Sequence, residues 1–314
     1  MAAARSRRSV LFPLIRFMTL LKRKSIEAVA SRRPARAKHE DRLDGVDHAD
    51  EPKRMAPRFA PVTFSELAGV RYLHFGTEWV QGAMRLSKPD AIELEYAQQM
   101  MAWLLFLDPQ SPTARPDFHV VQLGLGAAAL TKFCHRQLAP AQVTAVELNP
   151  SVIVAAHSMF NMPFDDARLS VLEQDAYDWV MDANHHGTVD ALQIDLYDAT
   201  ARGPVLDTPA FYRACRQVLR SPGVMTINLF GDHTSFPRNI ERICDAFDNR
   251  VLVFPEVHDG NVIALAFNGP PLQVSWDDVQ ARAAALQASL KLPTKGWAEG
   301  LRNANAGQED VLAI

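Results

Sequence analysis

Four acidic residues follow successive apolar segments in the middle of this 314-residue chain: Glu147, Asp175, Asp195 and Asp198. The apolar segments have the composition of buried strands, and each acid lies at or just past the end of one. The carboxyl ends of parallel strands share one crevice, so these acids are expected to converge on one ligand. Their order points to a nucleoside with a cationic partner.

A glycine turn precedes the acids in the segment VVQLGLGAAAL at 120–130. Gly124 and Gly126 permit a tight turn and close approach of a ligand. Ala129 completes the small-residue spacing of dinucleotide-binding turns, so the turn itself does not exclude pyrophosphate binding. The absence of an adjacent arginine or a second glycine-rich segment weighs against it.

Two of the acids suit recognition of a nucleoside. Glu147 ends the second strand, where a carboxylate can accept both hydroxyl protons of a ribose; support of the helix that starts at Pro150 is the alternative. Asp175 follows the third strand and is expected either to bind an adenine amino group or to cap the next helix.

The other two acids suit chemistry on an amine. Asp195 and Asp198 end the run ALQIDLYDA. Two neighbouring carboxylates repel each other, which raises one pKa and provides a proton acceptor, and the pair can equally hold a cationic amine. Stabilisation of the loop is the alternative. No histidine stands beside them at ligand spacing, so we expect no metal site.

Strands alternate with helices from about residue 118 onward, which predicts a mostly parallel sheet covered on both faces. The strands are expected near 118–123, 142–147, 168–173, 189–195, 223–229, 250–255 and 261–267. The helices are expected near 127–138, 150–160, 175–183, 208–220, 235–247 and 275–288. Only five residues separate the last two strands, so the final strand is expected to run antiparallel.

Upstream of the sheet, period-two segments at 62–86 predict a small antiparallel β meander. A helix is expected next, capped by Ser87, with Pro89 near its first turn and Asp90 and Glu93 at its amino end.

The composition fits a main domain with a small appendage, since 48% of the residues are hydrophobic. The three cysteines, Cys134, Cys215 and Cys244, form no disulfide or zinc spacing, which favours a reducing compartment and a cytoplasmic protein. No apolar run reaches the roughly 18 residues that span a bilayer.

The amino-terminal segment differs in charge from the rest. Residues 1–38 contain eleven Lys or Arg and one acid, whereas the remainder has a net charge of -13. An acidic body repels nucleic acid, so no nucleic-acid partner is expected. Three interpretations of residues 1–58 stay open: an unstructured basic extension, a weak membrane-surface contact and an organelle transit peptide.

These residues resemble the spermidine synthase family of aminopropyltransferases over about residues 62–270. The family has a glycine turn, an acid after the second strand, an Asp after the third and Asp-x-x-Asp after the fourth. Matching positions are Gly124, Gly126, Glu147, Asp175, Asp195 and Asp198, together with Pro209, Phe211 and Tyr212 at the start of the next helix. Gln81 resembles a meander glutamine, and Tyr96 resembles the tyrosine of a gate helix.

The resemblance implies a Rossmann-like, methyltransferase-type α/β fold. Together with the composition, it predicts an extension at 1–58, a β meander and gate helix at 59–110, a nucleoside-binding catalytic domain at 111–290 and a tail at 291–314. It implies decarboxylated S-adenosylmethionine as co-substrate, a polyamine such as putrescine as acceptor, no metal, and a homodimer. Asp195 would be catalytic, and Asp198, Gln81 and Tyr96 would bind the acceptor.

Two positions depart from the family pattern. The turn aspartate that contacts the aminopropyl end of the co-substrate is Ala127, and the helix motif has Gln99 in place of a glutamate. Both changes remove negative charge from where an ammonium would bind. Two further functions therefore remain open: an S-adenosylmethionine-dependent methyltransferase and a non-catalytic nucleoside- or polyamine-binding protein.

Overall fold

The computed structural model describes residues 59–107, 115–198, 205–257, 260–304 and 310–314. The extension at 1–58, with its three interpretations, lies outside these residues. Within the described ranges, no helix has both the length and the apolar character needed to cross a membrane.

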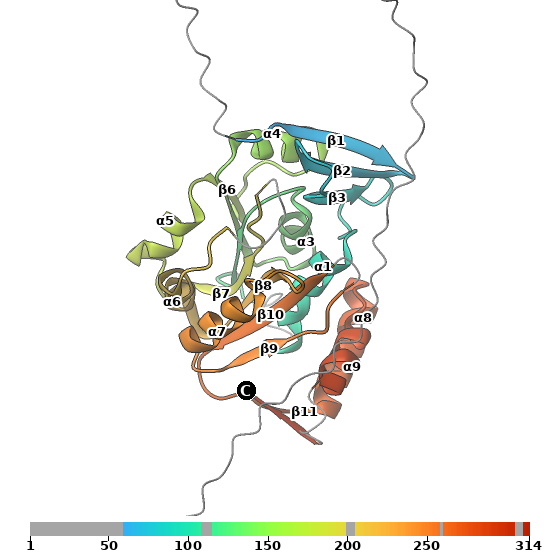
Figure 1. Cartoon of the computed structure of the whole chain (residues 1–314). Helices are drawn as coiled ribbons and strands as arrows, with labels where there is room; N and C mark the ends of the chain where they lie inside the picture. The colour runs from blue at the N-terminus through green and yellow to red at the C-terminus, as the bar shows by residue number, and fades with distance from the viewer. Residues whose placement is uncertain (1–58, 108–114, 199–204, 258–259, 305–309) are drawn as a thin grey trace, which may run out of the picture. The chain divides into compact units, whose positions relative to one another are not determined.

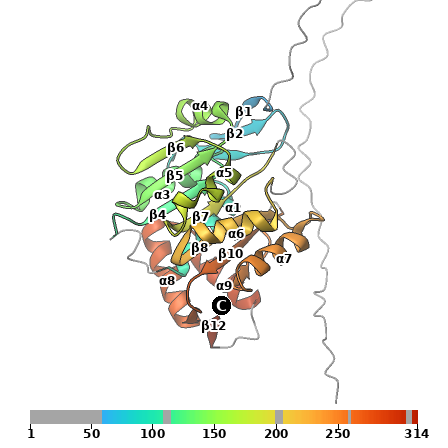
Figure 2. The same cartoon turned by 90° about the vertical axis from the view of Figure 1, so that its left-hand side faces the viewer.

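A seven-stranded mixed sheet forms the centre of the molecule (Figures 1 and 2). The strand order is β6-β5-β4-β7-β8-β10-β9, and β10 alone runs antiparallel to its two neighbours. This confirms the mostly parallel sheet and its antiparallel final strand. The strands are β4 (His119–Leu123), β5 (Gln142–Glu147), β6 (Leu169–Glu173), β7 (Val189–Ile194), β8 (Leu219–Phe230), β9 (Val251–Val253) and β10 (Asn261–Asn268).

Both faces of the sheet carry apolar side chains, since successive residues of its strands point to opposite sides. Helices therefore cover both faces. One face packs against α3 (Ala129–Gln137), α4 (Pro150–Met159), α8 (Trp276–Leu290) and α9 (Thr294–Ala304). The other packs against α5 (Ala176–Met181), α6 (Pro209–Val218) and α7 (Phe236–Ala246). A short 3-10 turn, η2 (Ala183–His185), follows α5.

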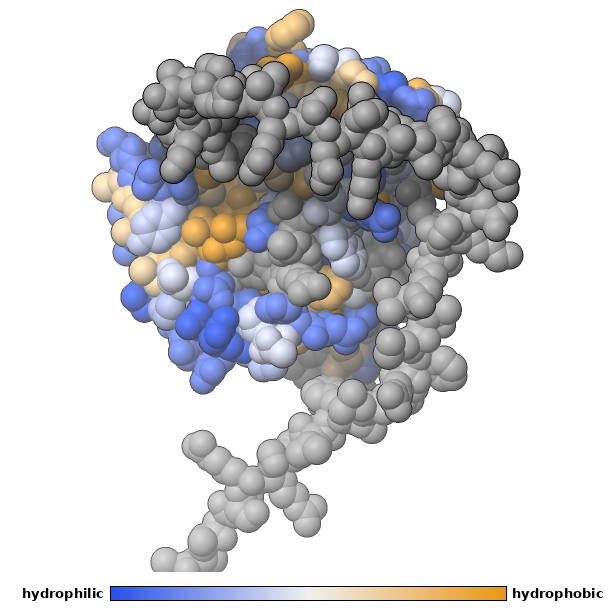
Figure 3. Space-filling view, turned by 45° about the horizontal axis from the view of Figure 1, so that its top comes forward, coloured by the Kyte–Doolittle hydropathy of each residue, from blue (hydrophilic) through white to orange (hydrophobic). Residues whose placement is uncertain are grey.

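The predicted meander is a separate three-stranded antiparallel sheet of β1 (Val62–Leu67), β2 (Val70–Phe75) and β3 (Gly82–Arg85). The Phe64 ring of β1 lies 5.9 Å from the Phe160 ring at the end of α4. On the face seen in Figure 3, hydrophilic side chains predominate and apolar ones interrupt them. Phe64 and Leu67 are among the exposed apolar side chains of the meander.

The helix expected from Ser87 begins later, and this prediction was wrong. The helix α1 spans only Glu95–Gln99 and continues as the 3-10 helix η1 (Met100–Leu105). The acids expected at its amino end bind elsewhere: Glu93 pairs with Arg85 of β3, and Asp90 pairs with Arg136 of α3 at 2.9 Å. These long-range ion pairs hold residues 87–94 against β3 and α3.

The segment at 291–314, set apart in the sequence as a tail, contributes to the core. Leu301 of α9 is fully buried, and so is Leu312 of the short strand β12 (Val311–Ala313). Strand β12 pairs with β11 (Gln273–Ser275) to form a two-stranded sheet. The boundary expected near residue 290 therefore falls between two packed helices.

Candidate active site

The glycine turn lies at the carboxyl end of β4, where the order of successive strands reverses between β4 and β7. The Gly124 N–H donates to the Val146 carbonyl of β5 at 2.9 Å, and the Asp195 N–H donates to the Leu123 carbonyl at 3.0 Å. Gly124 has φ of +89°, and a Cβ there would lie 2.3 Å from the Asp195 carbonyl oxygen. Only glycine fits this position.

Glu147 supports this turn from the end of β5. Its Oε2 accepts the Leu125 N–H at 3.0 Å, and its Oε1 accepts the Asn149 N–H at 2.8 Å. Burial raises the pKa of Glu147, and the backbone N–H groups of Leu125 and Asn149 oppose that rise. The carboxylate is therefore fixed in place beside the turn.

Asp195 is held by side chains from distant elements. Its Oδ1 accepts from Asn228 Nδ2 of β8 at 2.9 Å, and its Oδ2 accepts from the Tyr96 hydroxyl of α1 at 3.3 Å. Burial raises the pKa of Asp195, and these two hydrogen bonds oppose the rise. A carboxylate with a raised pKa is suited to accepting a proton.

The support behind Asp195 was missed in the sequence. Asn228 is buried, its Oδ1 accepts from Asn261 Nδ2 of β10 at 3.0 Å, and its carbonyl accepts from the Tyr197 hydroxyl at 2.9 Å. The available signal was a single asparagine within the apolar run VMTINLF of β8.

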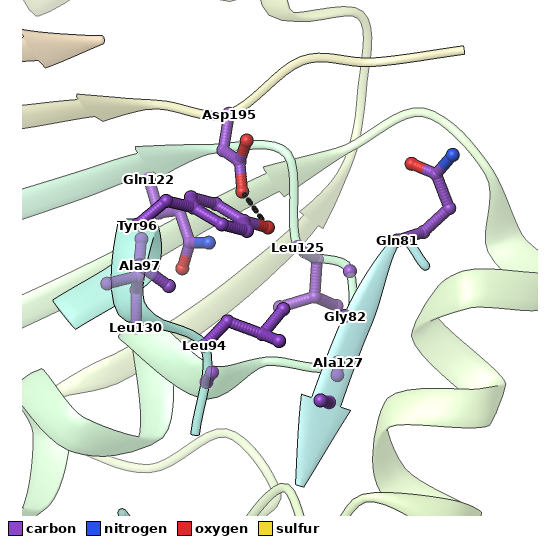
Figure 4. A pocket seen from close by; sticks show the side chains of 13 residues that line it. Gln81, Gly82, Leu94, Tyr96, Ala97, Gln122, Leu125, Ala127, Leu130 and Asp195 are labelled. Carbon is purple, nitrogen blue, oxygen red and sulfur yellow. Dashed lines mark hydrogen bonds between the residues drawn. The ribbon is translucent and has the colours of Figure 1, made fainter. Parts of the chain in front are cut away.

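A pocket opens in front of Asp195, between the glycine turn, β3, α1 and the first turn of α3 (Figure 4). Four predicted site residues line it together: Gln81, Tyr96, Gly126 and Asp195. Its remaining lining is largely apolar and includes one further polar side chain, Gln122 of β4. Gln122 was not among the predicted site residues, although a glutamine in the apolar run VVQLG was a visible signal.

The other predicted residues lie outside the lining of this pocket: Gly124, Glu147, Asp175 and Asp198. Asp175 caps α5, since its Oδ1 accepts the Tyr177 N–H at 2.8 Å. Asp198 is exposed, and its carbonyl accepts from Gln81 Nε2 at 3.1 Å. Within the described ranges, no group of three or more His, Cys, Asp or Glu side chains could hold a metal ion.

No protein-family model matches the chain. The polyamine aminopropyltransferase of Neisseria meningitidis serogroup A is 32% identical over 247 residues, which are 79% of this chain and 91% of that enzyme. The chain belongs to the polyamine aminopropyltransferase family. The resemblance inferred from the glycine turn and the acids is thereby confirmed.

Solved structures show the same fold for this family member. A probable spermidine synthase from Corynebacterium glutamicum has a TM-score of 0.59 at 17% identity, over 76% of this chain and 91% of that one. Human methyltransferase-like protein 13, solved in complex with SAH, has a TM-score of 0.55 at 20% identity, over 63% and 93% of the two chains. The Rossmann-like, methyltransferase-type fold is confirmed.

The position that departs from the family pattern in the turn, Ala127, packs directly against the meander. A Cβ on Gly82 of β3 would lie 2.7 Å from the Ala127 Cβ, and Ala127 is only 3% exposed. Two small residues thus bring β3 against the turn. In this member of the family, a carboxylate at residue 127 would have to fit beside the β3 backbone.

The second departure, Gln99, is also buried. Its Oε1 has no hydrogen-bond partner among the described residues, and Gln99 does not line the pocket. Neither departure leaves a carboxylate at its position. Of the described residues that line the pocket, Asp195 is the sole acid.

Proposed function

We propose that this protein transfers an aminopropyl group from decarboxylated S-adenosylmethionine to a polyamine such as putrescine and releases methylthioadenosine. Membership of the aminopropyltransferase family supports the reaction class. The observation that carries the proposal is the Asp195 carboxylate, which Tyr96 and Asn228 hold at the pocket beside the glycine turn.

In the proposed reaction, the amine nitrogen attacks the carbon bonded to the sulfonium. The C–N bond forms, the C–S bond breaks, and its electron pair stays on the sulfur of neutral methylthioadenosine. An amine with a pKa near 10 is protonated at neutral pH, so it must lose a proton before it attacks. Asp195 is proposed to accept or orient that proton, because burial raises its pKa.

The co-substrate is proposed to bind across the glycine turn, with Glu147 at its ribose and Asp175 at its adenine. Gly124 and Gly126 both have positive φ and pack against the Asp195 and Gln81 carbonyls, which sets the course of the turn. The fixed carboxylate of Glu147 suits the ribose hydroxyls. Asp175 keeps its capping bond, so adenine recognition would use its second oxygen.

The acceptor is proposed to enter beside Gln81, Tyr96 and Asp198. The bond from Gln81 to the Asp198 carbonyl joins the meander to the loop after β7, at the side of the pocket. The Asp198 carboxylate is proposed to attract the cationic amine, and the Tyr96 ring to form one wall.

The direct test is to incubate the protein with decarboxylated S-adenosylmethionine and a panel of diamines, and to measure methylthioadenosine by chromatography. Product formation with at least one diamine is expected. Absence of product across the panel, while the co-substrate binds by calorimetry, would instead support a non-catalytic binding protein.

A methyltransferase is the second candidate, and Ala127 favours it. With no carboxylate at this position, a co-substrate that carries its own carboxylate meets less repulsion. Release of S-adenosylhomocysteine from intact S-adenosylmethionine in the presence of an acceptor would identify this activity. Release of methylthioadenosine alone would exclude it.

A further inference from the structure

The end of the pocket beside α3 presents hydrogen-bond donors. Gln122 is 3% exposed and lines the pocket, and its Oε1 accepts from the Thr131 hydroxyl of α3. This bond fixes the orientation of the amide, so its Nε2 is left to face the pocket (Figure 4). Among the described residues, Nε2 has no acceptor. An amide N–H that faces the pocket can donate to an acceptor on a ligand.

The first turn of α3 adds further donors at the same place. Ala128, the residue before this nine-residue helix, provides no side-chain cap, and the first turn contains no acidic residue. Ala129 and Leu130 line the pocket, and their backbone N–H groups donate to none of the described residues. A helix amino end with unpaired N–H groups favours a negatively charged ligand group.

We propose that this end of the pocket is a subsite for a carboxylate, formed by the Gln122 amide and the first turn of α3. An ammonium group has no lone pair to accept these N–H groups, whereas a carboxylate accepts several. Ala127, next to the same turn, removes the acid that would repel such a ligand. Asp195 lines the same pocket, and its two oxygens are engaged by Tyr96 and Asn228.

The carboxylate could belong to either of two substrates. Intact S-adenosylmethionine carries one on the chain next to its sulfonium, and an ω-amino acid carries one at the far end of an acceptor amine. The proposal rests on the proposed function in that it places an adenosyl co-substrate on the glycine turn. It concerns whether the substrate group that enters the pocket carries a carboxylate.

The experiment compares matched ligands that differ by the carboxylate. Dissociation constants for intact and decarboxylated S-adenosylmethionine are measured by calorimetry. Rates of methylthioadenosine release from the decarboxylated co-substrate are measured with 4-aminobutyrate and with putrescine. The wild-type protein is expected to prefer the carboxylate-bearing member of at least one pair, and the pair identifies the substrate concerned.

Gln122→Leu tests the residue, and Gln193→Leu is the matched control. Gln193 is the register partner of Gln122 on β7, is fully buried and does not line the pocket. Gln122→Leu is expected to weaken binding or use of the preferred carboxylate-bearing ligand about 10-fold or more. The matched ligand without the carboxylate should change by less than about 3-fold. Gln193→Leu is expected to change neither ratio.

The proposal is overturned if the wild-type protein prefers the carboxylate-free member of both pairs, or if Gln122→Leu changes both members of each pair equally. If circular dichroism shows that Gln122→Leu is unfolded, the isosteric Gln122→Glu replaces it and is expected to reverse the preference. If the proposed function is wrong, no methylthioadenosine will form with any amine. The ratio of the dissociation constants of the two co-substrates can still be measured in that case.

Discussion

The two carboxylates that flank β4 are held in different ways. Glu147, at the end of β5, accepts backbone N–H groups from Leu125 and Asn149, which belong to the glycine turn and to its own loop. Asp195, at the end of β7, accepts from side chains of α1 and β8, 99 and 33 residues away in the sequence. Glu147 depends on main-chain geometry, and Asp195 depends on tertiary packing.

This difference suits the two carboxylates to the different roles proposed for them. Backbone donors are present whenever the turn is folded, so the environment of Glu147 changes little with substitutions elsewhere. The environment of Asp195 can be altered through Tyr96 or Asn228 without a change in the sheet. A fixed carboxylate suits recognition of a nucleoside, and an adjustable pKa suits proton transfer.

Asp195→Asn is expected to have the largest effect. Loss of the proton acceptor should lower kcat about 10²- to 10⁴-fold, while the thermal midpoint stays close to the wild-type value. The same substitution at the exposed Asp198 is the comparison, with a raised KM and a smaller change in kcat expected. An active Asp195→Asn protein would remove Asp195 from the role proposed for it.

Glu147→Gln is expected to act on binding. The amide NH₂ of the glutamine would face the N–H of Leu125 or Asn149, and two donors cannot form a hydrogen bond. The turn should therefore lose one hydrogen bond, and the free energy of unfolding should fall by about 1–3 kcal/mol. Co-substrate affinity should fall about 10- to 100-fold with little change in kcat at saturation. Calorimetry, steady-state kinetics and urea unfolding measure the three effects. A kcat loss as large as that of Asp195→Asn would contradict the division between the two carboxylates.

The same contrast explains what the sequence could predict. The strand at 142–147, the helix start at Pro150 and the glycine turn depend on neighbouring residues, and the structure has all three. The start of α1 was mispredicted because Glu93 and Asp90 bind residues of β3 and α3. The contact between Asn228 and Asp195 could not be predicted for a related reason. It requires the register of β7 with β8, which no local pattern specifies.

Asn228→Leu is expected to change the pH dependence of the reaction. The Asn228 amide opposes the burial that raises the pKa of Asp195, so its loss should raise that pKa further. A base must be deprotonated, and activity is lost as pH falls through its pKa. The acid limb of kcat against pH should therefore move to higher pH, with about a 10-fold lower rate near neutrality.

Tyr96→Phe provides the matched comparison for that shift. The Tyr96 hydroxyl lies 3.3 Å from Asp195, whereas the Asn228 amide lies 2.9 Å from it. The acid limb is therefore expected to move in the same direction by a smaller amount. An unchanged acid limb in both variants would show that another group titrates in the reaction.

The smallest effect is expected at Asp175, where a structural bond and a proposed ligand contact share one side chain. Asp175→Ala removes the cap of α5 and should lower the unfolding free energy by about 1 kcal/mol. Asp175→Ser keeps a capping oxygen but is too short to reach an adenine. If Asp175 also binds the co-substrate, both variants should weaken its affinity a few-fold by calorimetry, and only the serine variant should keep its stability. Wild-type affinity in both would leave Asp175 as a cap and Glu147 as the acid that recognises the nucleoside.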